Sequence, residues 1–127
     1  MTEYRAADFA FKLDLSKPLY GQVLEQIRLG IARGEIEPGS KIPSIRELAQ
    51  ALKVNPNTIM RAYQELDRDG LIETRIGQGT YITSSVEKAD EIRRNLARSA
   101  VEAFIGAMKS LKKSRKEAES LLKEAKW

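Results

Sequence analysis

The sequence predicts a mainly α-helical fold with one small β-hairpin, followed by a separate helical tail. Apolar residues recur at helical spacing in several segments, including residues 19–31, 45–66 and 92–122. Two matches to the Ser-x-x-Glu capping box, at Ser44 and at Ser114, mark helix starts. Residues 71–83 are rich in strand-forming residues and are interrupted by Gly77 and Gly79, which indicates the hairpin.

The composition excludes several classes of site. The 127 residues suffice for one compact domain and an appendage. The chain has neither Cys nor His, which excludes disulfides, zinc sites built on these residues and His-based catalysis. No paired acids, phosphate-cradling loop or metal-ligand spacing is evident, so we expect neither an enzyme nor a cofactor or metal. The N-terminus lacks the apolar run of a signal peptide or membrane span, and the lack of Cys fits a cytoplasmic location.

The first third of the chain predicts an arm and one helix. Residues 1–15 alternate weakly between apolar and polar side chains, and we expect an extended arm or a short strand that lies on the body. Apolar residues then recur at four-residue steps, which predicts a helix of about four turns from near Pro18 to near Gly34. We interpret this helix as a structural wall for the segment that follows.

Residues 44–66 predict two short helices joined by a tight turn. Ser44 and Glu47 form the capping box of the first helix. Asn55 suits the cap of the second, and Pro56 suits its first position, where no N–H is needed. Each helix has one apolar face, formed by Ile45, Leu48, Ala49 and Leu52 in the first and by Ile59, Ala62, Tyr63 and Leu66 in the second.

The other face of the second helix is polar near its start. It carries Asn57, Met60, Arg61 and Gln64. A helix that begins sharply, packs one side on a partner helix and presents short polar groups near its N-terminus suits entry into a DNA major groove. An ordinary αα-hairpin inside a helical core is the alternative that these residues leave open.

Charge is segregated along this segment. The net charge is +4, and residues 1–83 are neutral overall, so residues 84–127 hold the whole excess. Residues 41–61 are nonetheless basic, whereas residues 62–73 are acidic. The positive part therefore lies at the end of the motif that would face phosphates.

The hairpin extends the motif. Gly70 ends the second helix, residues 71–75 and 80–83 read as strands, and a glycine-bearing turn joins them. Two strands alone are marginally stable, so the hairpin must pack on the helices. With Arg75 beside the turn and Gln78 at its tip, it resembles a wing that follows a DNA backbone into the minor groove. Three helices and such a hairpin form a winged helix-turn-helix.

These residues resemble the N-terminal domain of GntR-type bacterial transcription regulators. The resemblance covers roughly residues 18–83 and consists of many motifs in the family's order. The segments that carry it are residues 18–22 (PLYGQ), 37–41 (EPGSK), 43–49 (PSIRELA), 54–58 (VNPNT), 62–66 (AYQEL), 69–72 (DGLI) and 77–81 (GQGTY).

The resemblance implies the DNA-contacting residues. It implies a DNA contact by Arg46, base and phosphate contacts by the start of the recognition helix, and a contact by the wing tip. Many members carry basic residues where this chain has Pro56 and Met60, and Arg61 is the candidate to supply that charge instead. The predicted DNA-binding set is Ser44, Arg46, Lys53, Asn55, Asn57, Thr58, Arg61, Gln78 and Gly79.

Residues 84–127 form the predicted tail. A long helical pattern covers residues 86–111, and Ser114 with Glu117 begins a second helix. Two amphipathic helices cannot bury their apolar faces alone, so they fold back on the winged domain or pair with another chain. We favour pairing, because two-fold symmetry is the commonest oligomeric state. The predicted dimerisation residues are Ile92, Leu96, Val101, Phe104, Ile105, Met108, Leu111, Leu121 and Leu122.

A tail of this size is similar to that of the YtrA-like subfamily of GntR regulators. The resemblance implies a dimeric repressor, often encoded beside ABC-transporter genes that it controls. We therefore expect a winged domain at residues 1–83 and a dimerisation tail at residues 84–127, with two recognition helices meeting a palindromic operator. Two alternatives stay open: a winged helix that binds a partner protein, and a sensor of a small-molecule effector with a cleft between the tail helices.

Overall fold

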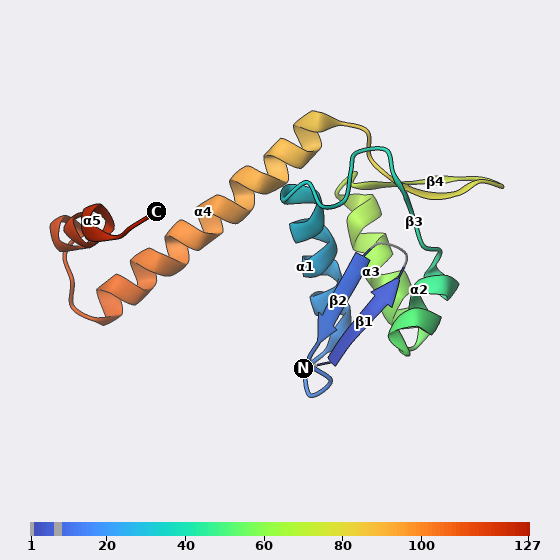
Figure 1. Ribbon diagram of the computed structural model, residues 1–127, viewed down its shortest axis with the longest axis horizontal. Helices are drawn as coiled ribbons and strands as arrows, with labels where there is room; N and C mark the ends of the chain where they lie inside the picture. The colour runs from blue at the N-terminus through green and yellow to red at the C-terminus, as the bar shows by residue number, and fades with distance from the viewer. Residues whose placement is uncertain (1, 7–8) are drawn as a thin grey trace. The chain divides into compact units, whose positions relative to one another are not determined.

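The computed structural model describes residues 2–6 and 9–127, and it confirms the mainly helical fold with small antiparallel sheets (Figure 1). The chain divides into two compact units, Met1–Arg93 and Arg94–Trp127. The elements of the described part are β1 (Thr2–Ala6), β2 (Phe9–Leu13), α1 (Leu19–Ala32), β3 (Lys41–Ile42), α2 (Ile45–Leu52), α3 (Pro56–Arg68), β4 (Ile72–Arg75), β5 (Gly79–Ile82), α4 (Val86–Ser110) and α5 (Arg115–Glu124).

The N-terminal segment is a β-hairpin rather than an extended arm. Strands β1 and β2 pair in antiparallel register, with Thr2 opposite Leu13. Phe11 and Leu13 are buried in the core. The side chain of Gln26 on α1 holds β2 in place, because it accepts a hydrogen bond from Lys12 N at 2.9 Å and donates one to Lys12 O at 2.6 Å. Met1 and residues 7–8 of the predicted arm lie outside the described residues.

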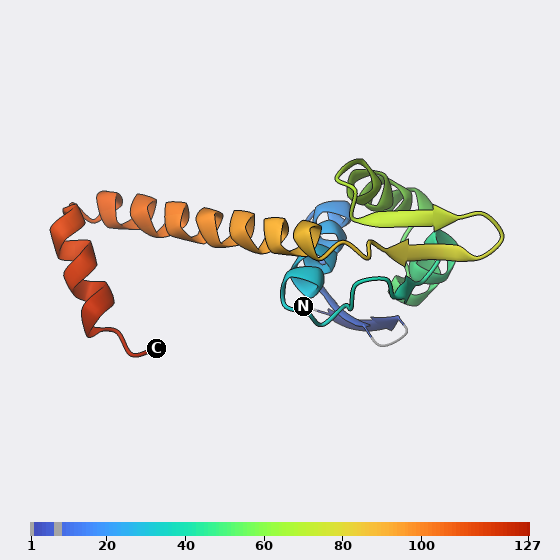
Figure 2. The ribbon, with the colours of Figure 1, turned by 90° about the horizontal axis from the view of Figure 1, so that it is seen from above.

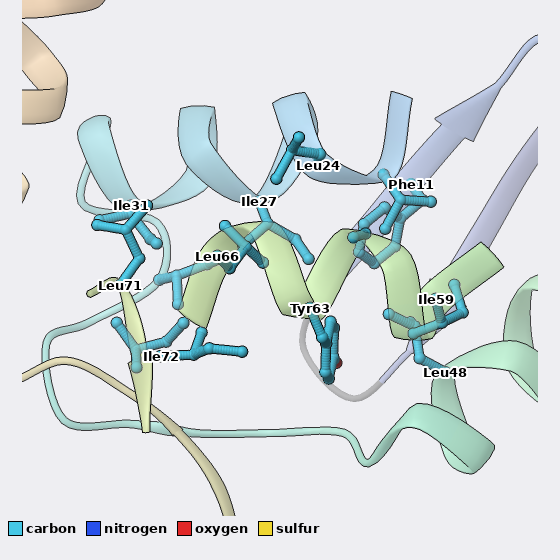
Figure 3. Close-up of a cluster of buried hydrophobic side chains, with 14 of the residues drawn as sticks. Phe11, Leu24, Ile27, Ile31, Leu48, Ile59, Tyr63, Leu66, Leu71 and Ile72 are labelled. Carbon is cyan, nitrogen blue, oxygen red and sulfur yellow. The ribbon is translucent and has the colours of Figure 1, made fainter. Parts of the chain in front are cut away.

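The core of the first unit lies between α1 and α3. Figure 3 shows Ile27 and Ile31 of α1 directed toward the α3 face that carries Ile59 and Leu66. Leu48 from α2 closes one end of this cluster. These are the apolar faces that the helical spacing predicted, so the periodicity identified the core of the helix-turn-helix correctly.

The predicted helix caps of the helix-turn-helix are all formed. Ser44 Oγ accepts a hydrogen bond from Glu47 N at 3.1 Å, and Glu47 Oε1 accepts one from Ser44 N at 3.2 Å. Lys53 ends α2 in the left-handed conformation, with φ of 57°. Asn55 Oδ1 then accepts a hydrogen bond from Asn57 N at 2.8 Å and caps α3, so only three residues separate the end of α2 at Leu52 from the start of α3 at Pro56.

The wing is part of a three-stranded sheet. Strands β4 and β5 form the predicted hairpin (Figure 2), and β3 pairs with the outer side of β5, so the strand order is β3-β5-β4. The sequence indicated only an extended segment at β3, because two residues are too few to show strand alternation. The third strand anchors the wing to the segment that leads into α2.

The first two turns of α4 belong to the winged unit. Ala89 is buried, Ile92 packs against the core, and Arg93 Nε donates a hydrogen bond to Ala32 O at 2.8 Å. The compact unit therefore ends at Arg93, ten residues beyond the predicted boundary at 83/84. Ile92, predicted as a dimerisation residue, is half-buried and packs against this core, since it lies in the part of α4 that belongs to the first unit.

The second unit contains the rest of α4 and the short helix α5. Lys112 ends α4 in the left-handed conformation, with φ of 62°, and the capping box of Ser114 and Glu117 begins α5 as predicted. Within residues 94–127, all of which are described, Ala118 alone is buried. No helix in the described part of the chain combines the length and apolar character that crossing a membrane requires.

Candidate nucleic-acid interface

The start of α3 presents polar side chains to solvent. Asn55 and Asn57 are exposed, and Thr58 is half-buried. The Asn55 side chain satisfies the N–H of Asn57, and the Asn55 carbonyl accepts a hydrogen bond from Thr58 N at 2.9 Å. The Asn57 amide is thus held on a capped, rigid helical turn while its own donors and acceptor stay open to water. Such an amide can pair with the edge of an adenine in the major groove.

Arg61 is exposed but is not extended along the outer face of α3. Its guanidinium carbon lies 3.9 Å from the centre of the Tyr20 ring, near the start of α1. A cation stacked on an aromatic face loses little side-chain freedom when it binds an anion. The stack therefore places a positive charge beside the recognition helix, where a phosphate rather than a base edge is the natural partner.

The two remaining predicted cations flank the helix turn. Arg46 is exposed in the first turn of α2, and Lys53 is exposed at the turn itself. Among the described residues, Arg46, Lys53 and Arg61 form no salt bridge. Their charges are therefore available to phosphates without first breaking an ion pair.

The wing lies against the start of α2 across an open groove of about 340 Å³. Ser44 and Gln78, which are far apart in the sequence, both line this groove, together with Lys41. Gly79 has a φ of +125°, and a Cβ atom built there would lie 2.7 Å from Lys41 Cε. The backbone conformation therefore favours glycine at this position, and the flexible end of the Lys41 side chain occupies the space beside it.

A second arginine is stacked on the wing. The guanidinium carbon of Arg75 lies 4.0 Å from the centre of the Tyr81 ring, and its Nη2 atom lies 3.6 Å from Glu73 Oε2. Arg75 pairs with Gly79 in the strand register, and its side chain is stacked over Tyr81 of the neighbouring strand. Residues 76–78, which form the tip of the wing, carry no charged side chain.

Hydrogen bonds fix the segment that joins the wing to α2. Tyr63 is buried in α3, and its hydroxyl donates a hydrogen bond to Pro43 O at 2.6 Å. Burial raises the pKa of the Tyr63 hydroxyl, so this hydroxyl stays protonated and continues to donate its hydrogen bond to Pro43 O throughout the neutral pH range. The hydrogen bond that Ser44 N donates to the Glu47 carboxylate lowers the pKa of this carboxyl, and the Ser44 hydroxyl lowers it further. The charged carboxylate is the form that caps Ser44.

The sequence did not identify three residues of this surface. Tyr20 holds Arg61, Lys41 covers Gly79, and Ile76 stands 97% exposed at the wing tip. No spacing along the chain links Tyr20 to Arg61, because the packing of α1 on α3 brings them together. Ile76 could have been found, because a large apolar residue beside two glycines has no place in the core.

The predicted tail residues do not form one closed cluster. Leu96, Phe104 and Met108 are half-buried. The remaining predicted dimerisation residues in this unit are exposed, namely Val101, Ile105, Leu111, Leu121 and Leu122. The second unit thus displays its apolar side chains rather than burying them.

The family model for bacterial regulatory proteins of the gntR family matches residues 19–82, the segment from α1 to β5. The chain belongs to the GntR family. Over 96 residues it is 49% identical to the HTH-type transcriptional regulator YhcF of Bacillus subtilis, covering 76% of this chain and 79% of that protein. It is also 46% identical over 72 residues to the transcriptional repressor YtrA of B. subtilis, covering 57% of this chain and 55% of that protein.

A solved structure supports the same assignment. A GntR family transcriptional regulator from Listeria monocytogenes is 36% identical and superposes with a TM-score of 0.80, covering 90% of this chain and 100% of that one. The winged helix-turn-helix is the DNA-binding domain of a transcriptional regulator, and the protein is not an enzyme. The YtrA-like resemblance noted in the sequence is confirmed as well.

Proposed function

We propose that the protein is a cytoplasmic, dimeric repressor that presents two copies of the α3 surface to a palindromic operator. The observation that carries this proposal is the open, capped start of α3, where Asn55 and Asn57 are exposed beside cations that form no salt bridge in the described part of the chain.

Each part of the surface has a distinct role in this proposal. Arg46, Lys53 and Arg61 neutralise phosphates, and so set the position of the helix on the duplex. Asn55, Asn57 and Thr58 contact base edges and the adjacent backbone. The groove edge and the wing, with Ser44, Gln78 and Gly79, follow the neighbouring strand of the duplex.

The tail supplies the second copy. Two helices with Val101, Ile105 and Leu121 exposed are not stable as an isolated pair, because they bury too little apolar surface. Pairing with the same helices of another chain covers these side chains and relates the two recognition helices by a two-fold axis. Half-sites about one helical turn apart, ~34 Å, are the expected consequence.

The similarity to YtrA supports repression. That relative is named a repressor, and a dimer that occupies an operator blocks transcription most simply by covering the promoter. The YtrA-like resemblance makes an adjacent ABC-transporter operon the first target to examine.

Selection of sequences from random DNA with the purified protein tests the proposal directly. Enrichment of an inverted repeat with one-turn spacing is the expected result. A selection that enriches no sequence, together with capture of a protein partner in the absence of nucleic acid, would instead support a protein-interaction module.

Arg46→Ala tests the assignment of the surface. We expect operator affinity to fall about tenfold and the slope of log affinity against log salt to decrease by about 1. Arg68→Ala is the matched control, because Arg68 is an exposed arginine at the opposite end of α3. Equal affinity of Arg46→Ala and the parent in a salt-matched gel shift would show that Arg46 does not contact the operator.

A further inference from the structure

The tip of the wing carries a large apolar side chain in open water. Ile76 is 97% exposed, which is more than any other large apolar residue between Thr2 and Leu122 in the described part of the chain. Gly77 follows it without a side chain, and the preceding Arg75 is turned back onto Tyr81. The wing therefore ends in an isolated apolar projection between charged flanks.

The turn that holds Ile76 is well defined. Gln78 N donates a hydrogen bond to Arg75 O at 2.9 Å, and Gly77 has a φ of +76°. Ile76 has no positive φ, so it occupies the second position of a type II turn and Gly77 the third. This turn requires glycine at the third position but accepts most residues at the second. Nothing in the fold therefore requires an isoleucine at the tip.

Cations stand on both sides of this projection. Arg75 is held over Tyr81 on β4 and β5, and the Lys41 side chain crosses Gly79 on the other edge of the hairpin. Arg75 also lies 3.6 Å from the exposed Glu73 carboxylate, and a phosphate can take the place of that weak surface ion pair. An apolar tip between two cationic side chains is complementary to a DNA groove, whose walls are phosphate backbones and whose interior is lined by sugars and base edges.

We propose that Ile76 enters the minor groove of the operator and selects A·T base pairs there. This inference rests on the proposed function, since it assumes a bound operator. The minor-groove edge of an A·T pair carries acceptors and no amino group, whereas a G·C pair adds the guanine N2 amino group to the floor of the groove. An isoleucine side chain fits against the first edge. Against the second, it collides with the amino group and leaves the amino hydrogens without water.

Inosine distinguishes this reading from a contact in the major groove. An inosine·cytosine pair has the major-groove edge of G·C but lacks the N2 amino group. In an operator obtained by selection, each A·T pair outside the recognition-helix contacts is replaced by G·C and, separately, by I·C. At the position under the wing we expect G·C to lower affinity about five- to tenfold and I·C to restore it to within about twofold.

The protein variant completes the test. Ile76→Ala should remove most of the difference between G·C and A·T at that position and leave discrimination under α3 unchanged. Ile76→Val, which keeps a branched apolar tip, should retain most of the difference. Since the Ile76 side chain is 97% exposed and buries almost no surface in the described fold, neither variant is expected to change the thermal midpoint of unfolding.

Three outcomes would overturn the inference while leaving operator binding intact. The first is that G·C is tolerated at every position outside the α3 contacts. The second is that I·C binds as poorly as G·C, which indicates major-groove reading. The third is that Ile76→Ala keeps the full preference for A·T. Failure of the parent protein to select any operator would instead refute the proposed function on which the inference rests.

Discussion

Two helix pairs in this chain, α2 with α3 and α4 with α5, have similar capping signals, but the apolar face of the first pair is buried and that of the second is exposed. Helix α2 begins at a capping box, and so does α5; α2 ends at a left-handed lysine, and so does α4. Yet Leu48 of α2 is buried, whereas Leu121 and Leu122 of α5 are exposed. Capping and periodicity thus define a helix equally well in both places, but they do not determine what its apolar face contacts.

The difference lies in what the rest of the chain provides. The pair α2 and α3 is covered by α1, by the β1–β2 hairpin and by the three-stranded sheet. Within residues 94–127 no further element is present to cover the second pair. The first pair is stabilised by its own unit, whereas the second needs a partner molecule in our proposal. The predictions below test this contrast, from the largest expected effect to the smallest.

The largest effect is expected in the first pair. Ile59→Ala removes a fully buried side chain of α3, and we expect it to lower the free energy of unfolding by about 2–5 kcal/mol in urea titrations. Ile105→Ala makes the same change in α4, where the side chain is 44% exposed. Its effect should be smaller and should depend on protein concentration, because it acts through association. A concentration-independent loss of similar size for Ile105→Ala would remove the contrast.

The second prediction separates the tail from the winged unit. Ile105→Glu combined with Leu121→Glu places charges on the exposed apolar face, and we expect the dimer dissociation constant to rise at least ~100-fold in sedimentation experiments. The winged unit should keep its cooperative unfolding. Ser99→Glu is the control, since its position lies on the opposite face of the same helix. Unchanged self-association of the double variant would exclude this face as the dimer interface.

The third prediction compares the two capping boxes. Ser44→Ala should lower the free energy of unfolding by about 1 kcal/mol, because α2 unfolds together with the first unit. Ser114→Ala should leave that value unchanged and instead increase amide hydrogen exchange in α5 alone. Aspartate at either position should restore the parent behaviour, since its carboxylate accepts the same hydrogen bond. Loss of global stability in Ser114→Ala would show that the two units unfold together.

The smallest effect is expected from pH. Hydrogen bonds from Ser44 and Ser114 lower the pKa of Glu47 and Glu117 below the ordinary value of 4.5. A lowered pKa in the folded state means that the carboxylate stabilises its helix above pH 4.5 and that this contribution is lost as the pH falls through the folded pKa. NMR titration of both carboxyls should show midpoints below 4.5. Each serine-to-alanine variant should move its own glutamate only part of the way back toward that value, because alanine keeps the backbone N–H that is the larger cause of the shift.

Much of the first unit was predictable because its signals are local. Ser44, Asn55 and the apolar periodicity specified where α2 and α3 begin and which faces are buried. The hairpin followed from the glycines at 77 and 79. Strand β1 and the two-residue β3 were not predicted, because such short segments become strands only through their pairing with β2 and β5.

By itself, the sequence determined the helices, their caps, the wing and the membership of the regulator family. The helices, caps and wing were predictable because hydrogen bonds within a few residues and one-face periodicity are readable along the chain, whereas the family followed from the resemblance of its motifs. Only the tertiary structure decided that Arg61 stacks on Tyr20, that Ile92 packs against the core of the first unit and that Ile76 is exposed at the tip of the wing. Each of these features depends on which segments lie next to one another in the folded chain. Packing between distant parts of the chain, rather than local conformation, determines those contacts.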